Sequence, residues 1–196
     1  MSREESTTRT RILKATCKLL AAGDGQGVRM ADIAKAAKIS RQAVYLHFPN
    51  RAELLIAATR HLDQAKGIDQ RLEASRTAQN GLVRLDAFVE AWGNYIPEIY
   101  GVARALMAMK DSDPEARAAW NDRMSAVREG CAAAVDALER DRRLTHVHSR
   151  DESIDILWML LSIRNWEHLI QDRGWSQQDY IDSIREIARR VLVRSA

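Results

Sequence analysis

The side chains with the clearest capacity for chemistry lie in one short stretch of the sequence. Ser40 can cap a helix, because its hydroxyl can accept a hydrogen bond from a backbone N–H of the first turn. Arg41 and Gln42 follow at once; a guanidinium can pair with O6 and N7 of guanine, and a carboxamide with N6 and N7 of adenine. Tyr45 and His47 offer polar tips one turn later, which suit phosphate oxygens. This order of residues predicts a helix that reads base pairs.

Two short helices must position these side chains. Apolar residues at helical spacing predict the first over residues 30–37, and a tight turn follows at residues 38–40. Behind the turn, Val44 and Phe48 repeat at i, i+4 and should face inward. Pro49 ends the second helix, because it has no N–H and disfavours helical geometry in the residue before it. Two short helices joined by such a turn predict a helix-turn-helix, which lays its second helix in the DNA major groove.

Residues 28–55 resemble the DNA-binding domain of the TetR family of bacterial transcriptional regulators. The Tyr-x-His-Phe core followed by a basic residue is quite specific to that family. The resemblance implies a three-helix head, a helical body that dimerises, and a small-molecule pocket in each body. The matching residues are Asp32-Ile33-Ala34, Ala37, Ser40, Ala43-Val44-Tyr45, His47-Phe48, Arg51 and Glu53-Leu54.

The motif departs from the family at three positions. Lys38 stands where many relatives have Gly, and a positive φ there would cost roughly 1 kcal/mol. Arg29 lies where relatives place a Thr or Ser near the first motif helix, so the usual cap is missing. Arg51 replaces a common Lys near a helix start, an unfavourable place for a cation unless it meets a phosphate. The predicted DNA-binding residues are Arg29, Lys38, Ser40, Arg41, Gln42, Tyr45, His47 and Arg51. The family also brings its first helix near the DNA backbone, so Arg9 is either a phosphate contact or a solvated basic residue.

The charge distribution supports this interpretation. Residues 1–62 contain 11 Lys/Arg against 5 Asp/Glu, a net charge of +6, whereas residues 63–196 contain 19 against 22, a net charge of −3. A basic head on a body without basic excess is the electrostatic footprint of a nucleic-acid-binding protein.

Composition limits the class of protein. The chain has 196 residues, of which 46% are hydrophobic and 29% charged, as in an ordinary globular protein. No apolar run is long enough to span a membrane, and the first residues lack the apolar stretch of a secretory signal. Cys17 and Cys131 are far apart and are expected to be small core residues in a reducing cytoplasm. We therefore expect a cytoplasmic protein with no membrane partner.

Helical spacing recurs throughout the chain, with no alternation typical of strands. The predicted fold is all-α: a three-helix helix-turn-helix head and a six-helix body, about nine helices in total. The predicted domains are residues 1–55 for DNA binding, and residues 56–196 for effector binding and dimerisation. Outside the motif, helices are expected over residues 8–22, 51–72, 82–92, 97–107, 114–140, 150–173 and 177–191.

The last two predicted helices carry more apolar surface than a small body can bury. Two such helices from each subunit could form a four-helix dimer interface, although they could also only fill the core of one chain. The expected interface residues are Leu157, Leu161, Ile184, Ile187 and Val191.

The resemblance also implies an effector pocket, framed by the helices that follow the head. Aromatic and Met residues at helical spacing could line it, or could be plain core. An apolar or aromatic effector would then release the protein from its operator. The candidate pocket residues are Trp92, Tyr95, Tyr100, Met107, Trp120, Met124 and Arg128.

The leading hypothesis is a homodimeric, ligand-responsive repressor of a palindromic operator, with no cofactor. A helical-bundle enzyme is the rival, but the sequence has no Glu-x-x-His pair, no P-loop, no GxGxxG and no zinc-type Cys spacing. His146 and His148 are the one close His pair, and no third metal ligand stands near them. A third hypothesis is a helical ligand-binding protein without a DNA function. We therefore expect no enzyme and no metal site.

Overall fold

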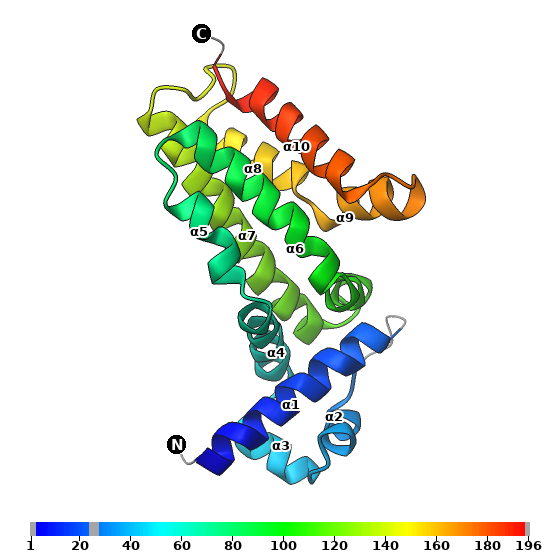
Figure 1. Cartoon of the computed structure of the whole chain (residues 1–196). Coiled ribbons are helices and arrows are strands. Elements are labelled where there is room, and N and C mark those ends of the chain that lie inside the picture. The colour runs from blue at the N-terminus through cyan, green and yellow to red at the C-terminus, as the bar shows by residue number, and fades with distance from the viewer. Residues whose placement is uncertain (1–2, 24–27, 195–196) are drawn as a thin grey trace. The chain divides into compact units, whose positions relative to one another are not determined.

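A computed structural model describes residues 3–23 and 28–194 (Figure 1). The described residues are helical apart from turns and a single β-bridge between Leu144 and Val193, so the all-α prediction is confirmed. The elements in chain order are α1 (Arg3–Ala22), α2 (Met30–Ala37), α3 (Arg41–His47), α4 (Arg51–Ala65), α5 (Ile68–Arg76), α6 (Gly81–Met109), α7 (Pro114–Arg140), α8 (Arg150–Leu160), α9 (Ile163–Trp166), the π-helix η1 (Glu167–Asp172) and α10 (Gln177–Leu192).

The chain forms two compact units. The first contains the chain up to Lys66 together with Ile99–Met124, and the second contains Gly67–Glu98 and the chain from Ser125 onward. The long helices α6 and α7 therefore contribute to both units. The division at residue 55 concerns function and stays a prediction.

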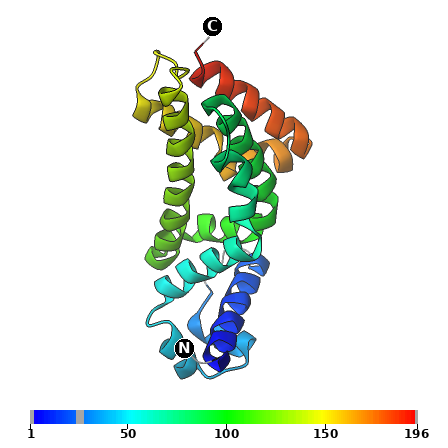
Figure 2. The ribbon, with the colours of Figure 1, turned by 60° about the vertical axis from the view of Figure 1, so that its left-hand side comes forward.

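The first unit is built around the N-terminal helices. Helix α1 packs on α2 and α4, and Figure 2 shows α1 in blue beside these helices. Ile12 and Leu20 of α1 are fully buried against residues of α2, α3 and α4. The same core continues into Leu106 of α6 and Ala116 of α7. The helix-turn-helix thus shares one hydrophobic core with parts of the long body helices.

Helix α1 begins earlier than the sequence indicated. Residues 3–7, expected to be outside the helix, are helical, whereas its end at Ala22 agrees with the prediction. Gly23 follows as expected, but Gly25 and Gly27, which were also expected to end the helix, lie outside the described residues.

The predicted single helix over residues 51–72 is wrong. Helix α4 ends at Ala65, and Gly67 adopts a left-handed conformation with φ of 67° before α5 begins at Ile68. Glycine reaches this conformation without the penalty that a Cβ would impose. A residue expected only to weaken the helix therefore ends it.

The predicted break before Pro97 is also wrong, because α6 continues through it. Proline cannot donate the hydrogen bond that the carbonyl of Gly93 would accept from residue 97. The side chain of Gln177 replaces this donor, with Nε2 2.7 Å from the Gly93 oxygen. Gly93 also permits close packing of α10, since a Cβ there would lie 2.7 Å from Cγ1 of Ile181. A contact from 84 residues away thus maintains the helix.

The predicted helix over residues 150–173 is interrupted. It begins as expected, with a reciprocal capping box between Ser149 and Glu152. It breaks at Ser162, whose hydroxyl accepts a hydrogen bond from the N–H of Arg164 at 3.2 Å. The π-helix η1 follows α9, and Gly174 ends the segment with φ of 72°.

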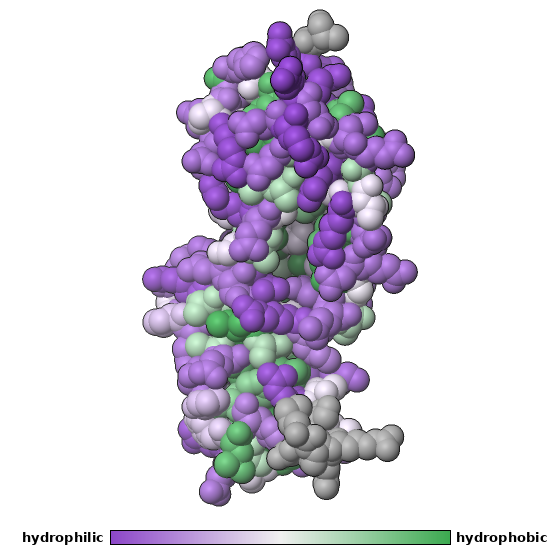
Figure 3. Space-filling model, turned by 90° about the vertical axis from the view of Figure 1, so that its left-hand side faces the viewer, coloured by the Kyte–Doolittle hydropathy of each residue, from purple (hydrophilic) through white to green (hydrophobic). Residues whose placement is uncertain are grey.

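No described helix could cross a membrane, since none is both long and apolar enough. The face in Figure 3 is mostly hydrophilic, with hydrophobic residues in small groups. Larger apolar side chains are nevertheless exposed at a few positions that bear on function.

Candidate nucleic-acid interface

The turn between α2 and α3 has a defined backbone geometry. Lys38 adopts a left-handed conformation with φ of 55° and ψ of 47°, as predicted. The N–H of Ile39 donates to the oxygen of Ala34 at 3.1 Å, and the N–H of Lys38 donates to that of Lys35 at 3.2 Å. This pair of bonds is a Schellman motif, which satisfies the last carbonyls of α2 and redirects the chain. It aims the chain into α3 at a cost of about 1 kcal/mol for a residue with a Cβ.

Helix α3 begins and orients as its sequence predicts. The hydroxyl of Ser40 accepts a hydrogen bond from the N–H of Ala43 at 3.1 Å. Val44 and Phe48 are buried in the core of the first unit. Because these two residues fix the inner face, the outer face consists of the exposed residues Arg41, Gln42, Tyr45 and Leu46.

Arg41 and Tyr45 interact on the outer face of α3. The guanidinium carbon of Arg41 lies 5.5 Å from the centre of the Tyr45 ring, and Nη2 donates to the Tyr45 hydroxyl at 3.3 Å. Both contacts join positions i and i+4, which are neighbours on a helix surface. Arg41 is therefore partly ordered before any ligand binds, which lowers the entropy cost of recognition.

The start of α2 carries Arg29, whose side chain makes no cap bond to the helix, as predicted. Its Nε lies 3.0 Å from Oδ2 of Asp32, and both residues are exposed to solvent. Hydrogen bonding from Arg29 lowers the pKa of the Asp32 carboxyl. The helix-turn-helix contains three further basic residues. Arg29 precedes α2, Lys38 lies in the turn, and the half-buried His47 is the last residue of α3.

Arg9 of α1 packs directly against the motif. Its guanidinium carbon lies 4.8 Å from the centre of the Phe48 ring. Such a cation–π contact is attractive, and it places a positive charge beside the end of α3. Arg9 therefore has a structural partner in the head, in addition to the two roles considered from the sequence.

Arg51 requires a correction, because its side chain is turned into the protein. Only 13% of the side chain is exposed, and Nη1 lies 2.8 Å from Asp113 and 3.0 Å from Glu115. Its Nε also donates to the backbone oxygen of Val28 at 2.6 Å. These contacts compensate its position at the start of α4, so the expected phosphate contact has no support in the structure.

The carboxyl of Asp113 responds to this arrangement. Burial alone would raise its pKa, but hydrogen bonds from the N–H of Ala116 and from Arg51 outweigh it and lower the pKa. Asp113 also caps the start of α7, as the sequence indicated. One carboxylate thus joins the first turn of α7 to the first turn of α4.

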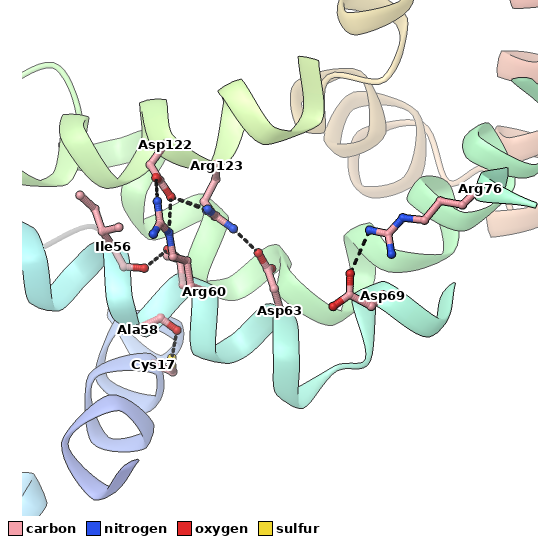
Figure 4. Close-up of polar contacts among 10 residues, drawn as sticks. Cys17, Ile56, Ala58, Arg60, Asp63, Asp69, Arg76, Asp122 and Arg123 are labelled. Atoms are coloured by element: carbon pink, nitrogen blue, oxygen red, sulfur yellow. Dashed lines mark hydrogen bonds and ion pairs between the residues drawn. The ribbon is translucent and has the colours of Figure 1, made fainter. Parts of the chain in front are cut away.

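A second set of ion pairs joins α4 and α7 further along (Figure 4). Arg60 of α4 pairs with Asp122 of α7, and Arg123 of α7 pairs with Asp63 of α4. Nε of Arg123 also donates to Asp122 at 2.8 Å, so the four residues form a continuous network. Partly buried networks restrain geometry more than isolated surface pairs. Helix α4, which directly follows the helix-turn-helix, is therefore fixed to the first half of α7.

Sequence reasoning missed Leu46. Its side chain is 82% exposed on the outer face of α3, four residues after Gln42. The helical spacing that placed Val44 and Phe48 inside also places residue 46 outside. Residue types and spacing therefore carried the signal for an exposed leucine at this position.

The structure distributes the candidate pocket residues between the units. Tyr100, Met107, Trp120 and Met124 belong to the first unit, where Met107 is buried and Trp120 packs against its core. The other three belong to the second unit. There Trp92 and Tyr95 are buried with ring centres 6.0 Å apart, and exposed Arg128 pairs with Asp155 at 2.8 Å.

The indole of Trp92 has a defined partner. Its Nε1 donates to the backbone oxygen of Leu161 at 2.8 Å. This carbonyl lies at the break between α8 and α9, where the helix no longer supplies a donor. For Trp92 the structure thus provides a packing role, and pocket lining stays a prediction.

The expected dimer residues also need correction. Leu157, Leu161 and Ile184 are buried within the chain's own core, so they do not present side chains to a partner. Ile187 is 43% exposed, and Val191 is half-buried. Apolar side chains that do face solvent on α8 are Trp158, 38% exposed, and Met159, 54% exposed.

The two cysteines are thiols with little reactivity. Burial raises the pKa of Cys17 to about 11 and that of Cys131 to about 12. Cys131 is fully buried, and Sγ of Cys17 lies 3.2 Å from the oxygen of Ala58 (Figure 4). Among the residues that the structure describes, no three His, Cys, Asp or Glu side chains cluster as metal ligands would.

Known proteins match both the sequence and the fold. Residues 12–58 match the family described as bacterial regulatory proteins, tetR family. The HTH-type transcriptional regulator CymR of Pseudomonas putida is 27% identical over 179 residues, which cover 83% of this chain and 81% of that protein.

Solved structures extend the similarity to almost the whole chain. NalD, the secondary repressor of the MexAB-OprM multidrug efflux pump in Pseudomonas aeruginosa, superposes with a TM-score of 0.69 at 23% identity, over 98% of this chain and 100% of that chain. The regulator FadR of Bacillus subtilis in complex with stearoyl-CoA gives a TM-score of 0.73 at 13% identity, over 91% and 96%. At these identities the structures support the fold.

Proposed function

This chain belongs to the tetR family of bacterial regulatory proteins, and from that premise we propose that it is a homodimeric repressor released from a palindromic operator by a small molecule. Regulators of this family bind DNA and small-molecule ligands and are not enzymes. The rival hypothesis of a helical-bundle enzyme is therefore set aside. A ligand-binding protein without a DNA function remains an outcome of the test below.

The outer face of α3 carries the proposal. Arg41 and Gln42 are exposed in the first turn of the second motif helix, the part that meets base edges in a helix-turn-helix. We assign them to base contacts and assign Tyr45 to the backbone and to orienting Arg41. Arg29, Lys38, Ser40 and His47 are proposed to contact phosphate or sugar around them. Because Arg51 is committed to Asp113 and Glu115, it is left out of this set.

A second copy of the chain would complete the DNA-binding protein. One short recognition helix reads few base pairs, whereas two, placed about 34–36 Å apart, read two half-sites of a palindrome. The exposed Trp158, Met159 and Ile187 of α8 and α10 supply apolar surface for a two-fold interface. We propose these side chains, together with Val191, as the interface in place of the buried Leu157, Leu161 and Ile184.

The proposed effector is a small apolar or aromatic molecule. The candidate lining residues are mostly aromatic or Met, and FadR of Bacillus subtilis was solved with stearoyl-CoA. NalD is described as a repressor, which supports the same role here. A 100-fold loss of operator affinity requires about 2.7 kcal/mol of coupling between the two sites. The ion pairs between α4 and α7 provide a route, because a shift of the first half of α7 would be transmitted to α4.

The decisive experiment is selection of bound duplexes from a random DNA pool by the purified full chain at moderate salt. The expected result is an enriched palindrome with two half-sites. Titration of that duplex then gives a stoichiometry of two chains per site. Absence of enrichment, with no duplex binding even at low salt, would contradict the proposal and favour a helical ligand-binding protein without a DNA function.

A further inference from the structure

Leu46 is a highly exposed leucine on the outer face of α3. Of its side chain, 82% is exposed, although α3 is anchored in the core by Val44 and Phe48. Exposing a leucine forgoes the stabilisation that its burial would provide. The other residues of this outer face, Arg41, Gln42 and Tyr45, all carry polar groups. An isolated apolar side chain in the middle of a polar recognition face suggests an apolar group on the partner.

The position of Leu46 selects that group. It follows Gln42 by four residues, so the two side chains lie one above the other on the same face of α3. A helix advances 1.5 Å per residue, so four residues advance by about 6 Å, less than two base-pair steps of 3.4 Å. If Gln42 reaches a base edge, Leu46 reaches the same groove within one or two base pairs. The apolar group that the major groove displays is the C5 methyl of thymine.

We propose that Leu46 is a specificity-determining residue that contacts a thymine methyl in each half-site of the operator. The inference rests on the proposed function, because it requires that α3 enters the major groove. It adds an apolar contact to the polar readout by Arg41 and Gln42. It therefore predicts a thymine within two base pairs of the one that Gln42 reads.

The test removes the methyl group without changing base pairing. Each thymine of a half-site is replaced in turn by deoxyuridine, symmetrically in both half-sites, and affinity is measured for the unmodified full chain and for Leu46→Ala. Replacement at one position should lower the affinity of the unmodified protein about fourfold per half-site, or about sixteenfold for the palindrome. This is the factor expected for burying one methyl-sized group in each half-site. Leu46→Ala should bind thymine and deoxyuridine duplexes equally at that position.

Two controls separate this contact from general effects. Leu46→Ala should unfold at the same temperature as the unmodified protein, because its side chain is exposed. Val147→Ala removes an apolar group that is 80% exposed in the second unit, and it should keep the full response to deoxyuridine.

The possible failures are distinguishable. If both proteins respond equally to every deoxyuridine, or neither responds to any, Leu46 contacts no thymine methyl and this inference is overturned while the proposed function stands. If Leu46→Ala weakens all sequences alike, the side chain packs on the sugar–phosphate backbone, which also overturns it. Absence of duplex binding by the unmodified chain would overturn the inference together with the proposed function.

Discussion

The outer face of α3 and the outer faces of α8 and α10 are all exposed in the single chain, but their exposed side chains differ in chemical type. Helix α3 presents a guanidinium, a carboxamide and a phenol around one leucine. Helices α8 and α10 present Trp158, Met159 and Ile187 among charged side chains that include Asp155, Glu186 and Arg190. A polar face with a cation gains most from an anionic, hydrogen-bonding partner, whereas an apolar face gains most from a matching apolar one. The contrast is what the two proposed interfaces require, one to DNA and one to a second copy.

The largest expected effect comes from the apolar face. Met159→Glu combined with Ile187→Glu should give a monomer in sedimentation velocity, because each interface would bury two carboxylates from each copy. Operator affinity should fall by about 100-fold or more, since the two half-sites are no longer bound jointly.

Val83→Glu is the matched control, because Val83 of α6 is 48% exposed and is not part of the proposed interface. It should leave the dimer and its operator affinity unchanged. A double variant that still sediments as a dimer would show that α8 and α10 do not form the interface.

The polar face should give the next largest effect. Arg41→Ala should cost about 1–3 kcal/mol per half-site and change the base preference at one operator position. The measurement is a competition assay with operators that carry each base at each position. An equal loss on all operators would show that Arg41 contacts phosphate instead.

A third variant separates stability from binding within the turn of the motif. Lys38→Gly should raise the free energy of unfolding by about 1 kcal/mol, because glycine adopts φ of 55° without a Cβ penalty. The corresponding rise in Tm is about 2–4 °C for a chain of this size.

If Lys38 neutralises a phosphate, the same variant should bind DNA more weakly. The slope of log binding constant against log salt concentration should then become shallower by about one unit for each half-site. Lys38→Asn, which also tolerates the left-handed conformation, should show the same loss of binding. An unchanged salt slope in both variants would leave Lys38 with a role in the turn alone.

The smallest expected effect is a dependence of stability on pH. Burial lowers the pKa of His61 from 6.5, and the charges of Lys14 and Arg9 lower it further. The unfolded chain therefore takes up a proton near pH 6.5 that the folded chain does not. This contribution to stability is complete above pH 6.5 and is lost as the pH falls toward the lower folded pKa. Urea unfolding at pH 7.5 and pH 5.5 measures it, and His61→Gln should reduce the difference. An equal difference in both proteins would assign it to other groups.

The helix-turn-helix was predictable because its signals are local. Ser40, Val44 and Pro49 each act within one turn of themselves, so residue types and spacing sufficed to place α3. Arg51 was misassigned because its partners, Asp113 and Glu115, come from a distant segment. No local rule indicates which carboxylate a buried guanidinium will meet.

The dimer residues show a different limit. Helical periodicity identified the apolar side chains of the last helices, but it cannot tell a chain's own core from a partner's surface. Leu157 and Ile184 proved to be core, whereas Trp158 and Met159, on neighbouring positions of α8, face solvent. The difference depends on how α8 and α10 pack, which only the three-dimensional structure provides.

The hydrogen bond from Gln177 to Gly93 has a consequence for how the chain folds during its synthesis. During synthesis Gly93 emerges from the ribosome 84 residues ahead of Gln177. Because Pro97 has no N–H, the Gly93 carbonyl has no protein donor in α6 until Gln177 arrives. Until α10 emerges and docks, α6 lacks one bond in its middle, and water must occupy the place. The hydrogen bond to the Gly93 carbonyl is therefore completed only after α10 is made. We expect amide hydrogen exchange in α6 near Gly93 and in α10 to slow together, as one cooperative step late in folding.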